Sequence, residues 1–209
     1  MISSESEAKA WCAERCDTQA MRQLEAFVGL LEEENARQNL VSASSLDHVW
    51  QRHVADSLQL KLHVPRGTFR PWLDLGSGPG LPGLVSTIVW PDSQHILVES
   101  RRKRHEWLTH VLDQLTLENV IIRGSRLENV DSVEAGVITA RAFAPLGKLL
   151  DLSARFSTRS TIWLLPKGRS AAQELAEQSK AVRAMFHVEQ SLTDPEASIL
   201  VGKGRPPRP

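Results

Sequence analysis

A glycine-rich segment, LDLGSGPGLPG at residues 73–83, has the most informative spacing in the chain. Glycines have no Cβ, so they adopt positive φ angles and let a ligand approach the backbone amides closely. Gly76, Gly78 and Gly80 match the GxGxG loop of S-adenosylmethionine-dependent enzymes. Read from Gly78 to Gly83, the same segment matches the GxGxxG loop of dinucleotide enzymes. The glycines therefore predict a nucleoside-containing ligand and leave two cofactors open.

Two carboxylates stand where an adenosyl ligand would need them. Asp74 lies two residues before Gly76, where a carboxylate attracts the cationic amino-acid end of S-adenosylmethionine and repels a diphosphate. Glu99 ends the next apolar run and is suited to accept hydrogen bonds from the ribose hydroxyls of either cofactor. Without the glycine loop, Glu99 would be interpreted as an ion-pair partner of Arg102 or Lys103. Asp74 therefore favours the sulfonium cofactor.

Positive charge is unevenly distributed, although the chain balances 25 basic against 25 acidic side chains. Residues 141–209 hold 11 basic and 6 acidic side chains, and a run of four cations begins at residue 101. Clustered cations can contact phosphate groups, and a solvated helix face is the alternative. The candidates for phosphate contact are Arg101, Arg102, Lys103, Arg104, Arg123 and Lys167. The neutral total predicts no general attraction to polyanions, so such binding must be local.

Three reactive side chains, His53, Asp56 and Ser57, lie within five positions of each other. They suggest a Ser-His-Asp triad, but they share one expected helix, with no strained elbow and no evident oxyanion hole. The pattern argues against a hydrolase, and local hydrogen bonds on a helix face are the alternative.

Cys12 and Cys16 are the two cysteines, with no second thiolate pair for zinc. We expect neither a disulfide framework nor a metal site.

The first 65 residues have the periodicity of amphipathic helices. Between residues 18 and 34, apolar side chains recur at helical spacing and leave the charged side chains on the other face. A second helix is expected within residues 42–60, capped by Ser44 with Asp47 three residues later. We predict an N-terminal helical extension over residues 1–65.

From Pro71 onward, short apolar runs alternate with helical stretches. The runs suited to buried strands are PWLDL, QHILVE, NVII, GVITA and TIWLLP, with SILVG as a possible last strand. The helical stretches are residues 84–90, 102–117, 146–156 and 170–185. This alternation predicts an α/β fold whose mainly parallel sheet is covered by helices on both faces. Ligands bind such sheets at the carboxyl ends of the strands, where the glycine loop lies.

The composition of the chain predicts its cellular location and its domain boundaries. No window approaches the ~18 apolar residues that a membrane helix needs, and the first residues do not resemble a signal peptide. We therefore expect a cytoplasmic protein. The expected divisions are the helical extension 1–65, the α/β domain 66–202, and a flexible tail 203–209 rich in proline and cations.

A set of short motifs follows a specific order between residues 39 and 168. The motifs are NLV, RHVADSL, LDLGSGPGLPG, LVESRRKR, RGSRLE, ITARAFAPL and LLPKG. Together they resemble the bacterial small-subunit ribosomal RNA methyltransferase G family, also called glucose-inhibited division protein B. The resemblance implies a class I, Rossmann-like methyltransferase fold with a seven-stranded sheet and S-adenosylmethionine as cofactor. It implies methyl transfer to N7 of a guanine in the decoding-region loop of 16S ribosomal RNA, with small-subunit RNA or the 30S subunit as partner of a monomer.

The resemblance also implies roles for matching positions. Gly76 and Leu81 would lie against the cofactor, together with the remaining glycines of the loop. Leu127 and Glu128 would flank the adenine. Arg141 would line the donor pocket near the reacting end.

The motif RHVADSL would face the catalytic cleft and the RNA. With Arg141, His53 and Asp56 are therefore the candidates for the catalytic set. Two positions depart from the family pattern, because Val41 stands where threonine is usual and Leu127 where a smaller residue is frequent. The first departure weakens any role carried over through NLV.

Guanine N7 carries a lone pair and no proton, so its methylation needs no general base. The rate would then come from placing the base in line with the methyl group and excluding water. Two alternatives remain at this point. One is a nicotinamide-dependent oxidoreductase that uses the overlapping GxGxxG loop. The other is a non-catalytic RNA-binding module on the same fold.

Overall fold

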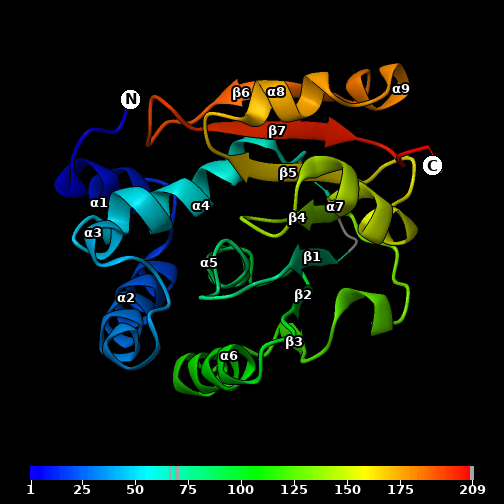
Figure 1. The fold of residues 1–209 in the computed structure, drawn as a ribbon. Helices are drawn as coiled ribbons and strands as arrows, with labels where there is room; N and C mark the ends of the chain where they lie inside the picture. The colour runs from blue at the N-terminus through cyan, green and yellow to red at the C-terminus, as the bar shows by residue number, and fades with distance from the viewer. Residues whose placement is uncertain (66, 69–70, 208–209) are drawn as a thin grey trace.

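The fold is organised around one sheet. The computed structural model describes residues 1–65, 67–68 and 71–207. Seven strands lie in the order β3-β2-β1-β4-β5-β7-β6 (Figure 1). They are β1 (Trp72–Leu75), β2 (His95–Val98), β3 (Val120–Arg123), β4 (Val137–Thr139), β5 (Ile162–Lys167), β6 (Phe186–Gln190) and β7 (Ser198–Lys203).

The strands from β3 to β5 pair in parallel, and β7 runs antiparallel to both of its neighbours. Leu73 of β1 pairs with Ile96 of β2 on one side and with Ile138 of β4 on the other. Every residue of β1, β2 and β4 is buried, and apart from Asp74, His95 and Thr139 their side chains are apolar. The expected mainly parallel α/β sheet is confirmed.

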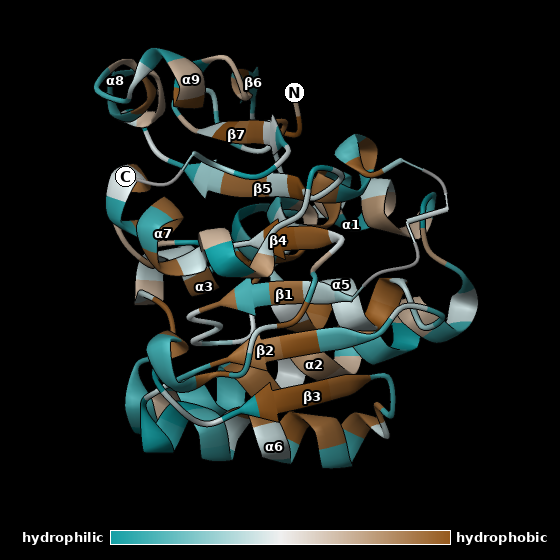
Figure 2. Cartoon of the chain, turned by 90° about the vertical axis from the view of Figure 1, so that its right-hand side faces the viewer, coloured by the Kyte–Doolittle hydropathy of each residue, from teal (hydrophilic) through white to brown (hydrophobic). Residues whose placement is uncertain are grey.

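Helices cover both faces of the sheet, and the central strands are predominantly apolar (Figures 1 and 2). The helices are α1 (Glu5–Ala13), α2 (Thr18–Gln38), α3 (Ala43–Leu46), α4 (Asp56–Leu58), α5 (Gly83–Val89), α6 (Arg102–Leu115), α7 (Leu146–Ser153), α8 (Ala171–Ala176) and α9 (Lys180–Arg183). The apolar core on one face joins α1, α2, α5 and α6. The core on the other face joins α7, α8 and α9 to the strands.

The N-terminal extension is helical, as expected, but it is not two continuous helices. Between α3 and α4 lies a π-helical segment, Trp50–Ala55, and a 3₁₀ turn, Gln59–His63, follows α4. Ser42, and not Ser44, caps α3 by accepting a hydrogen bond from the Ser45 amide. The expected cap is therefore wrong by two positions, because Ser42 has the extended backbone that a cap requires.

The region after β5 also differs from the sequence pattern. The stretch 170–185 forms two short helices, α8 and α9, and Ser179 caps the second by accepting from the Val182 amide. The sequence pattern does not indicate strand β6, because only Phe186 of its five residues is buried. An edge strand with mostly exposed side chains has no apolar run to reveal it.

Ile2 near the N-terminus and Gly204 after β7 are both held by hydrogen bonds to other parts of the chain. The Ile2 amide donates to the Leu192 carbonyl at 2.7 Å. Strand β7 extends to Lys203, and the Gly204 carbonyl accepts from Trp163 Nε1 at 2.8 Å. Arg208 and Pro209, part of the expected flexible tail, lie outside the described residues. Among the helices of the described residues, none is long and apolar enough to span a membrane.

Candidate active site

The candidate site lies where the strand order reverses, between β1 and β4. The loops that follow these two strands and β2 leave the same edge of the sheet, which is the edge where open α/β sheets bind ligands. The glycine loop follows β1. Gly76, Gly78 and Gly80 have φ angles of 66°, 53° and 95°, so all three use the left-handed backbone that favours glycine.

Contacts from β2 and α6 hold the glycine loop in place. The amides of Gly76 and Ser77 both donate to the Val98 carbonyl, at 2.8 and 3.0 Å. From the other side, Trp107 Nε1 donates to the Pro79 carbonyl at 3.0 Å. A Cβ on Gly80 would collide with the Leu84 side chain, so the loop also passes too close to α5 for a larger residue.

Glu99 links the glycine loop to the start of α6. Its buried carboxylate accepts from the Gly78 amide at 2.9 Å through Oε2 and from the Arg101 amide at 2.7 Å through Oε1. A carboxylate has about four acceptor sites, so two such bonds leave capacity for ligand hydroxyls. Ribose binding by Glu99 stays a prediction, which this remaining acceptor capacity allows.

Asp74 is placed differently from the sequence expectation. Side chains alternate along a strand, and Leu73 and Leu75 enter the core on the α7 face. Asp74 therefore points to the other face, where its Oδ1 accepts from Thr139 Oγ1 at 2.7 Å. Its Oδ2 lies beside Gly83 at the start of α5 and has no hydrogen-bond partner among the described residues. Burial raises the pKa of this carboxyl group.

A smaller cavity of about 280 Å³ opens beside the glycine loop, on the α7 face. It brings together three residues expected at the donor site, Gly76, Leu127 and Glu128. We call it the donor cavity; its other lining residues are Val98, Ser100, Ser125, Arg126, Phe143, Ala144, Lys148 and Leu152. Of the other residues expected to bind the cofactor, Leu81 is buried in the core on the α5 face.

A larger cavity of about 970 Å³ adjoins it, between the N-terminal extension and the ends of β5 and β7 near Lys167 and Ser198. We call it the acceptor cavity. His53, Asp56 and Arg141, the expected catalytic set, all line it, as does Lys167. Ser57 does not belong to this group, because its hydroxyl is buried and donates to the His53 carbonyl at 2.7 Å.

Arg141 joins the two other members of the set. Its Nη1 lies 3.3 Å from Nδ1 of His53 and 3.5 Å from Oδ2 of Asp56. A guanidinium can only donate, so Nδ1 of His53 accepts and the proton of the neutral ring is on Nε2, which contacts Ser45 Oγ at 3.0 Å. Burial, and then the charges of Arg141 and Arg52, lower the pKa of His53 to about 3. Burial raises the pKa of Asp56, while Arg141 opposes that shift.

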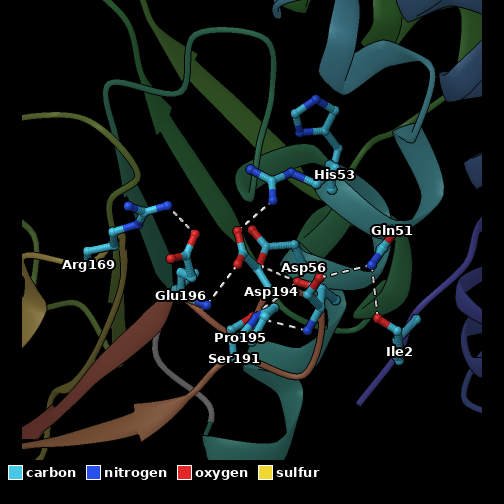
Figure 3. Close-up of polar contacts among 12 residues, drawn as sticks. Ile2, Gln51, His53, Asp56, Arg169, Ser191, Asp194, Pro195 and Glu196 are labelled. Carbon is cyan, nitrogen blue, oxygen red and sulfur yellow. Dashed lines mark hydrogen bonds and ion pairs between the residues drawn. The ribbon is translucent and has the colours of Figure 1, made fainter.

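A loop that is distant in the sequence, residues 191–197, packs against Asp56 and its neighbours (Figure 3). Thr193 Oγ1 donates to Oδ1 of Asp56 at 3.0 Å, and Gln59 Nε2 donates to the same oxygen at 2.8 Å. Arg52 pairs with Asp194 at 2.5 Å. Sequence reasoning missed Thr193 and Asp194, because they belong to no motif and lie more than 130 residues from their partners.

Of the expected phosphate-binding cations, Arg101, Arg102, Lys103 and Arg123 are exposed. Arg104 is not, because its Nη2 donates to the Asn39 carbonyl at 2.9 Å and ties α6 to the end of α2. Lys167 Nζ is mostly buried and pairs with Glu174 at 2.7 Å. A phosphate would have to displace that carboxylate to reach Lys167.

Among the described residues there is no group of three His, Cys, Asp or Glu side chains suited to a metal ion.

Comparisons with known proteins place the chain in one family. Residues 20–198 match the model of the GidB family, described as rRNA small subunit methyltransferase G. The ribosomal RNA small subunit methyltransferase G of Erythrobacter litoralis is 60% identical over 205 residues, which cover 98% of this chain and 99% of that protein.

Two solved structures share the fold at low sequence identity. A mutant of MtNAS in complex with S-adenosylmethionine aligns with a TM-score of 0.58 and 16% identity, covering 97% of this chain and 84% of that chain. The putative methyltransferase yhhF from Escherichia coli aligns with a TM-score of 0.56 and 12% identity, covering 73% of this chain and 87% of that chain. These likenesses show the fold alone, which is that of S-adenosylmethionine-dependent methyltransferases.

Proposed function

The chain belongs to the rRNA small subunit methyltransferase G family, and from this premise we propose that it methylates N7 of one guanine in the decoding-region loop of 16S ribosomal RNA. It is an S-adenosylmethionine-dependent methyltransferase of small-subunit ribosomal RNA. Family membership argues against the nicotinamide oxidoreductase that the overlapping GxGxxG loop allowed. The further proposal is that the chain acts as a monomer, in the cytoplasm, on small-subunit RNA or the 30S subunit.

The residues present fit the cofactor. S-adenosylmethionine supplies a methyl carbon on a sulfonium, which a nucleophilic nitrogen attacks directly. Gly76, Leu127 and Glu128 line the donor cavity, which lies next to the glycine loop. The three glycines of the GxGxG motif in that loop all have a positive φ. Glu99 keeps free acceptor capacity beside that loop, as a ribose-binding residue needs. We therefore assign donor binding to these four residues. In this assignment Asp74 and Gly80 contribute to the conformation of the loop and do not contact the donor.

The acceptor side has the properties that N7 methylation requires. Guanine N7 carries no proton, so the site needs orientation and not a base. His53 is unsuited to be a base near neutral pH, because its pKa is about 3 and its free nitrogen already accepts from Arg141. Arg141 is suited to orient the guanine by donating to O6, a hydrogen-bond acceptor next to N7, which leaves the N7 lone pair free to attack the methyl carbon. His53 and Asp56 then act as positioning residues for Arg141.

One observation carries the proposal: the donor cavity and the acceptor cavity meet at Phe143 and Ala144, which line both. A methyl-transfer enzyme must bind its two substrates in adjoining spaces with no water between them. Exposed cations at Arg101, Arg102, Lys103 and Arg123 supply charge for the RNA backbone nearby.

The decisive experiment is mass mapping of small-subunit RNA from cells that lack the gene. We expect one guanine to lose a single methyl group, and re-expression of the wild-type chain to restore it. An unchanged methylation map would reject the ribosomal assignment. A chain that binds small subunits but restores no methyl group would instead be a non-catalytic RNA-binding module.

A second measurement tests the cofactor separately. S-adenosylhomocysteine should raise the melting temperature of the purified chain, whereas NAD should leave it unchanged. Protection by NAD alone would contradict the donor assignment.

A further inference from the structure

Phe143 occupies the boundary between the two cavities. It follows β4 by four residues and lines both the donor cavity and the acceptor cavity. A Cβ built on Gly76 would lie 2.7 Å from Cδ2 of the Phe143 ring, so the ring rests directly on the glycine loop. The side chain is only partly buried, and its inner part packs against the core on the α7 face. An aromatic ring is therefore presented at the point where the two substrates must meet.

The backbone next to Phe143 adopts an uncommon conformation. Ala142 has a φ of 54°, a left-handed geometry that residues with a Cβ seldom adopt. It separates Arg141, which contacts His53 and Asp56, from Phe143, which contacts Gly76. In a regular strand, residues two apart would point to the same side. The turn at Ala142 thus directs the two side chains to different parts of the site, and such strain is concentrated at functional sites.

No other phenylalanine or tryptophan lines the acceptor cavity within the part of the chain that the structure describes. His53 also lines it, but the ring is buried and both of its nitrogens are occupied by Ser45 and Arg141. The remaining lining residues are small, polar, charged or aliphatic. A planar base entering this cavity has one free aromatic face available to it.

We propose that Phe143 stacks on the acceptor base and holds its plane at the junction of the two cavities. This inference rests on the proposed function, because it requires a nucleobase as the acceptor. Stacking on an aromatic side chain fixes the plane of a base without reading its identity. In this arrangement Phe143 sets the plane, and the hydrogen-bond donors of Arg141 select the edge that faces the donor cavity.

The test compares Phe143→Leu with Phe143→Tyr. Leucine keeps the apolar contact with Gly76 and removes the aromatic face, whereas tyrosine keeps both. Methyl transfer from labelled S-adenosylmethionine to small subunits isolated from cells lacking the gene gives kcat and KM, and calorimetry gives the affinity for S-adenosylhomocysteine. We expect Phe143→Leu to lower kcat/KM about 10-fold or more with little change in S-adenosylhomocysteine affinity, and Phe143→Tyr to stay close to the wild type.

Leu152→Ala is the matched control, because Leu152 lines the donor cavity and not the acceptor cavity. We expect it to weaken S-adenosylhomocysteine binding more than Phe143→Leu does. If Phe143→Leu transfers methyl groups like the wild type, or loses S-adenosylhomocysteine affinity by the same factor as activity, the stacking role is overturned. If the wild type transfers none, the proposed function fails and the stacking role fails with it. Activity in the wild type and in Phe143→Leu alike overturns the stacking role only.

Discussion

The Arg141 guanidinium donates to Nδ1 of His53 across 3.3 Å, which fixes the state of both side chains. His53 must be neutral to accept, and its pKa of about 3 keeps it neutral near pH 7. Oδ2 of Asp56 lies 3.5 Å from the same Nη1 atom of Arg141 and supplies the negative charge that pairs with the guanidinium. The group is therefore built to hold a cation in one orientation and not to transfer protons.

Arg141→Lys should lower methyl transfer strongly. A lysine ammonium is a single point of charge and cannot contact His53, Asp56 and a guanine edge together. Loss of one or two charge-assisted hydrogen bonds, each worth about 1.5–3 kcal/mol, predicts a fall in kcat/KM of about 10-fold or more. The measurement is methyl transfer to small subunits, with Arg159→Lys, an exposed site, as control. Equal rates for both variants would contradict the orienting role.

Stability should fall as the pH drops below about 6.5. His53 and His95 are buried, and burial lowers their pKa values to about 3 and about 4. Unfolded histidines bind protons near pH 6.5, so between that pH and the folded values the unfolded state binds more protons. The contribution of these two histidines to the free energy of unfolding is therefore fully retained above pH 6.5 and decreases on acidification, by at most about 1.4 kcal/mol per pH unit for each histidine.

Urea unfolding at pH 7.5, 6.0 and 5.0 measures this dependence. His95→Gln should flatten the curve, because one of the two buried histidines is gone, whereas the exposed His110→Gln should not. Parallel curves for the wild type and His95→Gln would show that His95 is not held neutral in the folded state.

The sheet was predictable from sequence because burial on both faces leaves an unmistakable pattern. Residues of β1, β2 and β4 are buried without exception, and apart from Asp74, His95 and Thr139 they are apolar, so the strands stand out between polar loops. The glycine loop was predictable because a positive φ at Gly76, Gly78 and Gly80 demands glycine at fixed spacing.

The remaining features depend on tertiary packing that no local pattern records. Asp74 stands at the expected strand end, but the alternation of β1 turns it toward α5 and away from the donor cavity. Thr193 contacts Asp56 only because β7 returns to the neighbourhood of β5. Strand β6 has Phe186 as its single buried residue, so it has no apolar pattern of its own. Its backbone pairing with β7 makes it a strand.

Thr193→Val should weaken both stability and activity. Valine has nearly the same shape but no hydroxyl, so Oδ1 of Asp56, whose side chain is only 16% exposed, loses one of its two donors. Leaving such a mostly buried acceptor less satisfied costs about 1–3 kcal/mol in the free energy of unfolding. Activity should also fall, since Asp56 holds Arg141. Thr109→Val is the control, because that hydroxyl is exposed and bonds only within α6; an effect of equal size there would refute the specific role of Thr193.

Gly78→Val should abolish donor binding and leave the chain folded. Gly78 has a φ of 53°, which a β-branched residue adopts only with strain, and its amide donates to Glu99. A shift of this residue would therefore release the Glu99 carboxylate that we propose binds the ribose. Calorimetry with S-adenosylhomocysteine measures the loss, and circular dichroism checks the fold. Gly29→Val in α2, where an added Cβ meets nothing within 4 Å, should bind as the wild type does. Normal affinity in Gly78→Val would refute the assignment of the glycine loop.

Neutralising the exposed cations at the start of α6 should change how RNA binding depends on salt. Arg101, Arg102 and Lys103 are exposed, and each RNA phosphate that they neutralise releases condensed counterions. Replacing all three by glutamine should reduce the slope of log K against log salt by about 0.7–0.9 for each phosphate that the variant no longer neutralises. Filter binding of small-subunit RNA at several salt concentrations gives this slope, and S-adenosylhomocysteine affinity should not change. Lys180→Gln on α9, at the far edge of the sheet, is the control. Because binding that uses other surfaces would keep its slope, an unchanged salt dependence in the triple variant would move the RNA interface away from α6.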